Sequence, residues 1–260
     1  MICLPLKLYM PRYFLEVSYK GTAYSGFQAQ KNANTIQAEI EKAFKILQKQ
    51  TILLTGSSRT DAGVHALQNF FHFDYDDKIN PHFIYKINAI LPGDIVIKKL
   101  LEMNPGAHCR FDAIARGYKY FIYRQKQPFL NDRAFFFPYK LDIEVMREAA
   151  ELIKDYSDFT SFSKRNTQVK TFNCQVAKSE WGWEEDCLVY NTSANRFLRG
   201  MVRALVATML KIGRGKTTIE EFRNMIEQKD CTKVSFAVPA HGLFLVAVNY
   251  PDNYFSHKKN

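Results

Sequence analysis

The sequence predicts an α+β fold built from two similar halves. Its 260 residues are enough for one large domain or two modest ones. Each half mixes strand-like segments with about two helices, and no linker rich in glycine and serine divides the chain. We therefore expect a joint near residues 105–115, with a first α+β domain over 10–110 and a second over 111–260. Residues 1–9, which precede the first convincing strand, are expected to be an N-terminal extension.

In the first half, apolar alternation and turn-forming residues mark the expected elements. Alternation predicts a strand over residues 12–19, which ends at Lys20-Gly21. Asn34 or Thr35 can cap a helix, because apolar residues then recur at helical spacing as far as Leu47. The other expected elements are a short strand over 52–55, a strand over 66–73, a helix that Pro81 opens and that ends near 91–94, and a strand over 95–100.

The second half opens with a run rich in aromatic and β-branched residues, which predicts a strand over residues 111–124. Asp142 is expected to cap a helix, and Thr218 begins another with Glu221 in the capping-box position. Apolar residues at helical spacing predict a further helix over 195–211. The remaining strands are expected over 169–180, 188–192 and 242–250.

The composition favours a polyanionic partner. The chain carries 36 Lys and Arg against 26 Asp and Glu, which gives a formal charge of +10, and its sequence pI is near 9.3. Each phosphate that such a surface contacts releases counterions, which adds affinity without regard to sequence. Charge alone leaves two interpretations open, a nucleic-acid partner and a solvated basic surface that aids solubility.

The cysteines and histidines indicate neither disulfides nor a metal. Five cysteines are scattered singly, without a C-x-x-C pair, and six histidines show no metal-ligand spacing. An odd, unclustered set of cysteines fits a reducing compartment. No segment is long and apolar enough to cross a membrane, and the first residues make a poor signal peptide. We therefore expect a cytoplasmic protein without a metal and without a membrane association.

The most informative segment is the loop from Gly56 to His65. It places small residues, an arginine and an aspartate between two strands, so its backbone can turn tightly and approach a ligand. Taken by itself, such a loop is better explained as a structural turn, in which Asp61 bonds nearby backbone amides and Arg59 is solvated.

The complete string from Arg59 to Ala66, RTDAGVHA, resembles the active-site signature of the TruA family of tRNA pseudouridine synthases. The resemblance extends over essentially the whole chain and keeps the order of the family's landmarks. The other segments that resemble the family are Tyr19–Gln28, Phe111–Asp112–Ala113 with Arg116–Tyr120, Phe159–Phe162, Ala194–Arg203 and Gly242–Leu245.

Two places depart from the family or align poorly. Ser58 stands where many members have glycine immediately before the arginine. Serine is small and tolerates turns, so we expect a slightly stiffer loop rather than lost activity. The polar stretch 163–167 has no clear counterpart in the family.

The resemblance implies both the fold and the reaction. The fold is the pseudouridine synthase fold, with two ferredoxin-like or RRM-like halves that form a continuous, mixed and mostly antiparallel sheet, helices packed on it, and a central cleft. The reaction breaks the N1–C1′ bond of uridine, turns the base and rejoins it through C5. It involves no redox change and no outside group, so we expect no cofactor.

The resemblance also implies the catalytic residues. Asp61 supplies the carboxylate, which attacks the ribose or the base, or stabilises charge at C1′. Arg203 is expected to be the cation beside it; without the resemblance, its position on a helix is better explained as a surface charge. Tyr118 is expected to lie against the target base and to help move the C5 proton; the alternative is a core tyrosine. Arg59 is expected to enter the space that the extruded base leaves.

Further contacts and partners follow from the same resemblance. Arg196 and Arg199 are candidates for phosphate contacts, and Leu245 is a candidate for substrate binding. Family members are homodimers that bind one tRNA across both subunits, and they modify uridines 38, 39 and 40 of the anticodon arm. We expect the same partner, assembly and target positions here.

Two functions from other classes compete with this interpretation. A catalytically silent RNA-binding protein explains the charge and the tyrosines, but it does not explain an aspartate beside an arginine in a glycine-flanked loop. An unrelated small-molecule enzyme with Asp61 as general base explains the loop but not the charge. Release of tritium from C5-labelled uridine in tRNA discriminates all three.

Overall fold

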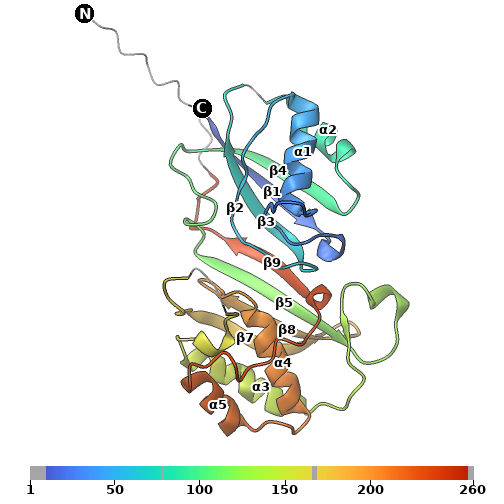
Figure 1. Cartoon of the computed structure of the whole chain (residues 1–260), viewed down its shortest axis with the longest axis vertical. Coiled ribbons are helices and arrows are strands. Elements are labelled where there is room, and N and C mark those ends of the chain that lie inside the picture. The colour runs from blue at the N-terminus through green and yellow to red at the C-terminus, as the bar shows by residue number, and fades with distance from the viewer. Residues whose placement is uncertain (1–9, 78, 166–168, 257–260) are drawn as a thin grey trace, which may run out of the picture.

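One sheet of nine strands runs through both halves of the chain (Figure 1). The structure is a computed structural model that describes residues 10–77, 79–165 and 169–256, so the expected extension over 1–9 lies outside the described residues. The strands follow the order β4 (Ile95–Met103), β1 (Arg12–Tyr19), β3 (His65–Asp74), β9 (Leu243–Asn249), β5 (Ala115–Tyr123), β8 (Cys187–Ala194) and β7 (Val176–Glu184), with β2 (Thr55–Gly56) beside β3 and β6 (Phe135–Phe136) beside β5.

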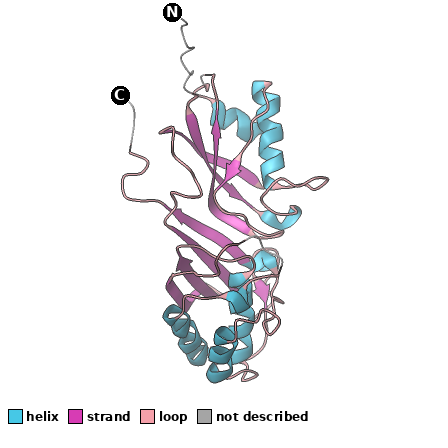
Figure 2. Ribbon diagram, turned by 60° about the vertical axis from the view of Figure 1, so that its left-hand side comes forward, coloured by secondary structure: helices cyan, strands magenta, loops and turns pink. Residues whose placement is uncertain are grey.

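The sheet is mixed and mostly antiparallel. Strands β3 and β9 pair in parallel, as do β5 and β6, while the other pairs of the described strands are antiparallel. Figure 2 shows the strands continuing from the upper to the lower half with the helices packed beside them. The predicted α+β class and the mostly antiparallel sheet are therefore confirmed.

Two helices pack on the first half of the sheet and three on the second (Figure 1). Their bounds are α1 (Ile36–Gln48), α2 (Phe83–Ile90), α3 (Ile143–Leu152), α4 (Met201–Gly213) and α5 (Ile219–Glu227). Three predicted caps are confirmed, because Thr35 accepts from an amide of α1, Asp142 accepts from two amides of α3, and Thr218 forms a capping box with Glu221. Among the residues described here, no helix has both the length and the apolar composition needed to cross a bilayer.

Each half has its own hydrophobic core, and β9 contributes to both. The first core gathers buried side chains of β1, β3, α1 and α2, such as Phe14 and Phe44; the second gathers those of β5, β8 and the helices α3 to α5. Leu243 belongs to the second core, whereas Leu245 and Val248 belong to the first. Strand β9 therefore holds the two halves together by apolar contacts on both sides.

The ladder between the halves is short. Strands β3 and β9 share two register pairs, His65 with Phe244 and Ala66 with Leu245. Beyond these pairs, the Oε1 atom of Gln68 on β3 accepts a hydrogen bond of 3.1 Å from the backbone N–H of Val248 on β9. A side chain therefore replaces the backbone as hydrogen-bond acceptor where the pairing of the two strands ends. This junction comes directly after the Gly56–His65 loop and carries it at the boundary of the two halves.

Four predicted element starts are wrong by three residues or more. The strand expected over residues 111–124 is β5, which begins at Ala115. The strand expected over residues 52–55 is reduced to Thr55–Gly56, and the strand expected over 169–180 is β7, which begins at Val176. The helix expected from residue 195 begins at Met201. Asn195 instead continues the pairing between strands, because its N–H donates to the carbonyl of Gln175 and its Oδ1 accepts the N–H of Gln175.

Candidate active site

The loop that carries Asp61 is fixed from below by buried polar side chains. We call residues 57–64 the Asp61 loop. The hydroxyl of Tyr19 on β1 lies 2.8 Å from Oγ1 of Thr60, and Nδ2 of Asn69 on β3 donates to the carbonyl of Ser58 at 2.8 Å. Both Tyr19 and Asn69 are buried, so these bonds form away from competing water. The sheet therefore sets the position of Asp61.

A second segment supports the Asp61 loop from the side. The N–H of Phe27 donates to the carbonyl of Thr60 at 3.1 Å, and the N–H of Gly21 donates to Nδ1 of His65 at 3.0 Å. Burial lowers the pKa of His65, which keeps its imidazole neutral and able to accept that bond. The stretch from Gly21 to Phe27, which belongs to the first predicted landmark, thus has a structural role beside the loop.

Arg199 is the cation next to Asp61. Its Nε lies 3.4 Å from Oδ1 of Asp61, and the two side chains are 62% and 24% exposed. Arg199 lies in the loop before α4, and Gly200 takes φ +79° where that loop meets the helix. The side chain of Arg199 can therefore extend toward Asp61. A carboxylate that is partly exposed and next to a guanidinium is accessible to a substrate and has a positive charge beside it.

The predicted pair between Asp61 and Arg203 does not form in the part of the chain that the structure describes. The guanidinium of Arg203 donates instead to the carbonyl of Val238, at 2.9 Å from Nε and 2.7 Å from Nη2, and to that of Phe236 at 3.3 Å. The reason is the later start of α4, which puts Arg203 in the first turn and leaves Arg199 in the preceding loop.

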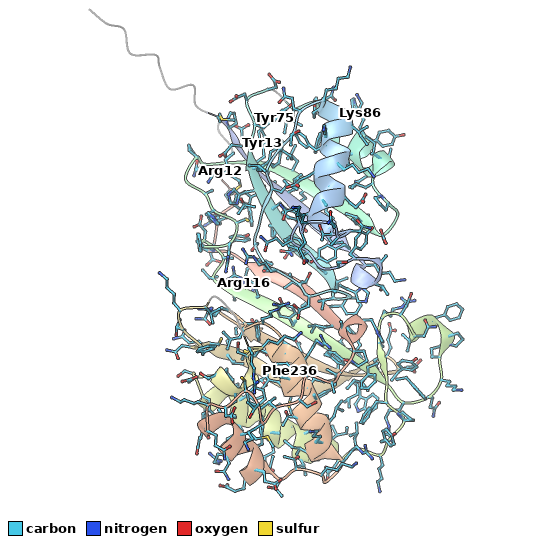
Figure 3. All side chains as sticks on the ribbon, in the orientation of Figure 1. Arg12, Tyr13, Tyr75, Lys86, Arg116 and Phe236 are labelled. Atoms are coloured by element: carbon cyan, nitrogen blue, oxygen red, sulfur yellow. The ribbon has the colours of Figure 1, made fainter. Side chains whose placement is uncertain are left out.

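Arg203 holds a segment that passes over the Asp61 loop. We call residues 234–240 the strap. The hydroxyl of Tyr120 donates to the carbonyl of Pro239 at 2.8 Å, and a Cβ on Gly63 would lie 3.2 Å from that of Ala240. Figure 3 shows Phe236 of the strap in the lower half of the molecule. Arg203 is therefore linked to the Asp61 loop through the strap rather than by direct contact.

Tyr118 lies on β5, in register with Leu245 of β9 and Thr192 of β8. Its ring meets that of Phe197 edge-on, with 5.1 Å between centroids and an interplanar angle of 84°. Burial raises the pKa of Tyr118 to about 12, the positive charge of Arg116 opposes this, and the carboxylate of Asp61 adds to it. The phenol is consequently protonated at neutral pH, and Asp61 is close enough to influence it.

Leu245 is completely buried below these groups. It stands between Ala66 of β3 and Tyr118 of β5 in the sheet register. Its side chain belongs to the first hydrophobic core, against which Tyr118 also packs. Leu245 thus forms part of the floor on which Tyr118 rests. A direct contact between Leu245 and the substrate stays a prediction.

Arg59, Arg110 and Arg196 lie close together, and we call them the arginine cluster. Burial lowers the pKa of Arg110, and the positive charges of Arg59 and Arg196 lower it further. Arg116, which is labelled in Figure 3, connects their supporting segments. It donates to the carbonyls of Arg110, Ala113 and Asn195 at 2.6, 2.8 and 3.0 Å. Sequence reasoning identified Arg59 and Arg196 but assigned no role to Arg110 or Arg116, although both lie within or beside the second landmark.

The described side chains supply no evident metal site. Across residues 10–77, 79–165 and 169–256, no three His, Cys, Asp or Glu side chains are grouped as ligands. A cavity of about 530 Å³ lies at the far end of β5, lined by residues such as Tyr123, Arg124 and Trp183, and so does not coincide with Asp61. The central cleft expected between the halves stays a prediction.

Comparison with known proteins gives a consistent result along the chain. The family model described as tRNA pseudouridine synthase matches residues 16–112 and 155–251. The tRNA pseudouridine synthase A of Parabacteroides distasonis is 46% identical over 248 residues, which cover 95% of this chain and 98% of the relative. That of Bacteroides thetaiotaomicron is 43% identical, covering 96% and 94%, and that of Staphylococcus aureus is 34% identical, covering 93% of each.

Proposed function

The chain belongs to the tRNA pseudouridine synthase family, and we propose that it isomerises uridines 38, 39 and 40 of the tRNA anticodon arm with Asp61 as the nucleophile. The resemblance to the TruA family is confirmed, and pseudouridine synthases are isomerases. The observation that carries the proposal is the partly exposed carboxylate of Asp61, 3.4 Å from the Arg199 guanidinium, on a loop that the sheet fixes in place.

The reaction is balanced without a further reactant. The N1–C1′ bond breaks, the base turns, and a C5–C1′ bond forms while C5 loses a proton and N1 gains one. The carboxylate of Asp61 supplies the electron pair of the nucleophile and recovers it when the product is released. Arg199 places a positive charge beside that carboxylate throughout, a role that the family resemblance assigned to Arg203.

Tyr118 and Arg59 complete the proposed site. Tyr118 stacks on the target base from the floor of the site, since its ring is braced by Phe197 and its phenol is protonated at neutral pH. The target base must leave the stem or loop before Asp61 can reach it, and extrusion costs a few kcal/mol. Arg59, which is exposed two residues before Asp61, is suited to fill the vacated space with its planar guanidinium.

The remaining parts of the proposal concern binding and assembly. Arg196 contacts the phosphates of the tRNA, in keeping with the net charge of +10, and Leu245 supports the base through Tyr118. The enzyme works as a homodimer in the cytoplasm, with one tRNA contacting both subunits. Sedimentation with and without tRNA tests the assembly.

The experiment that tests the reaction is tritium release from tRNA labelled at C5 of uridine. We expect release by the wild type and a loss of about four orders of magnitude or more in Asp61→Asn. Asp76→Asn, which removes an exposed carboxylate elsewhere, is the matched control and keeps its rate. Mapping of pseudouridines in the treated tRNA tests the positions. RNA binding without any release leaves the silent RNA-binding protein as the explanation, and products outside the anticodon arm refute the proposed specificity.

A further inference from the structure

Phe111 is an exposed aromatic side chain beside the candidate site. It follows Arg110 in the connection between β4 and β5, and 74% of its surface is accessible. Exposure of one apolar side chain is ordinary in a folded protein. What distinguishes Phe111 is that its ring packs on His108 and has the guanidinium of Arg110 beside it.

Hydrogen bonds and a ring contact hold the turn below Phe111. The ring of His108 lies 4.2 Å from that of Phe111 with an interplanar angle of 34°, and Nδ1 of His108 accepts the N–H of Phe111. Asp112 closes the turn, because its Oδ2 accepts from the N–H of His108 at 2.8 Å and from the hydroxyl of Tyr254 at 2.6 Å. His108 thus supports the ring of Phe111 while most of its surface stays uncovered.

The arginine cluster borders this ring. The guanidinium carbon of Arg110 lies 5.7 Å from the ring centroid. Arg116 bonds the carbonyls of both Arg110 and Asn195, which puts the neighbouring Arg196 beside this segment, and the positive charges of Arg59 and Arg196 act on Arg110. Arg59 precedes Asp61 by two residues, and Arg196 lies in the same loop as Arg199, which contacts Asp61. The exposed ring is therefore connected to the catalytic carboxylate through two separate segments that both carry arginine.

From this arrangement we propose that Phe111 is a platform on which an unpaired base of the substrate RNA stacks, next to the extruded uridine, while Arg110 and Arg196 hold the flanking phosphates. The inference rests on the proposed function and deepens it by assigning a second base-binding position. Bases stack on exposed aromatic rings whatever their identity, because each base has a π face. Cations beside the ring select RNA over an apolar or basic protein partner.

The proposed contact makes Phe111 a positioning residue. Stacking of a neighbouring base orients the strand so that the target uridine enters the site over Tyr118. Loss of the stacking contact at Phe111 weakens RNA binding and raises KM. The value of kcat at saturating RNA changes little, because Asp61 and Arg199 are unchanged. A group that reacts with the substrate would show the opposite division between the two constants.

The experiment compares Phe111→Leu and Phe111→Tyr with the wild type in RNA binding and tritium release. Fluorescence anisotropy with labelled anticodon-arm RNA measures Kd. We expect Phe111→Leu to raise Kd and KM about 10-fold, which lies toward the lower end of the range for one stacked base, and Phe111→Tyr to stay within about 2-fold of the wild type. Phe129→Leu is the matched control, since Phe129 is 75% exposed and follows the opposite end of β5.

A second measurement uses the wild-type protein and changes the RNA. Each unpaired nucleotide of the anticodon loop is made abasic in turn, and Kd is measured with wild-type and Phe111→Leu protein. One abasic position should weaken the wild type about 10-fold and leave the variant unaffected. The platform is refuted if Phe111→Leu binds like the wild type, if Phe129→Leu loses as much, or if no abasic position couples to Phe111. Absence of tritium release by the wild type refutes the proposed function instead, and the binding measurements still decide on Phe111.

Discussion

Replacing Arg203 and Arg199 separately with methionine distinguishes a residue that holds the strap from one that serves the carboxylate. In the structure Arg203 bonds the carbonyls of Val238 and Phe236, whereas Arg199 bonds Asp61. Methionine keeps the length and the apolar stem of either side chain and removes the charge. The two variants should therefore fail in different measurements.

The expected magnitudes follow from the contacts. A hydrogen bond to a charged group contributes about 1.5 kcal/mol or more, so loss of the bonds to two carbonyls should cost Arg203→Met about 3 kcal/mol of unfolding free energy. The Arg199 pair is long and its arginine is 62% exposed, so Arg199→Met should cost less than about 1 kcal/mol. Removing the positive charge beside the nucleophile should lower kcat of Arg199→Met about 100-fold.

Urea unfolding, followed by circular dichroism and by the fluorescence of the buried Trp181, measures the stability term. With an m value of about 3 kcal/mol/M, the midpoint of Arg203→Met should fall by about 1 M. Tritium release measured where both variants are folded gives kcat, and we expect Arg203→Met to lose less of it than Arg199→Met. An unchanged urea midpoint for Arg203→Met, or a larger loss of kcat than in Arg199→Met, would refute this reasoning and restore Arg203 as the partner of Asp61.

Three further predictions concern other side chains. Tyr118→Phe keeps the ring against Phe197 and should retain kcat within about 10-fold, because a phenol with a pKa near 12 stays protonated at neutral pH and cannot accept the C5 proton; abolished turnover in a folded variant would show a direct role in proton transfer. Arg59→Ala should lower kcat more than it weakens tRNA binding, which parallel measurements of kcat and Kd check; equal losses would contradict insertion into the vacated space. Burial, followed by the charges of His108 and Arg12, lowers the pKa of His72 from 6.5 to about 4, so the unfolded chain binds a proton in that range that the folded chain excludes. The contribution of neutral His72 to the free energy of unfolding should be fully present above pH 6.5, and about 3 kcal/mol of it should be lost as the pH approaches 4. In His72→Asn this part of the acid dependence should vanish. A urea midpoint that varies with pH in the variant as in the wild type would argue against this role of His72.

Local signals in the sequence were sufficient for the starts of α1, α3 and α5. Thr35, Asp142 and the pair of Thr218 and Glu221 cap helices as predicted, because a cap involves residues only two or three positions apart. The Asp61 loop could be identified for a related reason, since its whole motif is contiguous. These parts of the fold and the site can be predicted without knowing which residues pack against them.

The start of α4 could not be predicted in this way. Helical spacing of apolar residues continues upstream to Phe197, yet Asn195 pairs with Gln175 of another segment and Gly200 takes a left-handed conformation. Those contacts depend on the assembled sheet, and they decide which arginine reaches Asp61. The contacts of Arg110 and Arg116 were missed for the same reason, because Arg59, Asn195 and Arg196 lie far from them along the chain.

The position of β9 has a consequence for how the molecule reaches its native state. This strand follows the other eight along the chain, yet it lies between β3 and β5 and supplies the register pairs on either side. Until residues 243–249 have left the ribosome, β3 and β5 present unpaired edges, and such edges are prone to association. Pairing between segments so distant in sequence is also slow, because a long loop must close first. Because β9 pairs with both β3 and β5, we expect the proposed site of Asp61 and Tyr118 to form only after this final strand is inserted. Partially synthesised chains should therefore lack activity and depend on protection of those two edges.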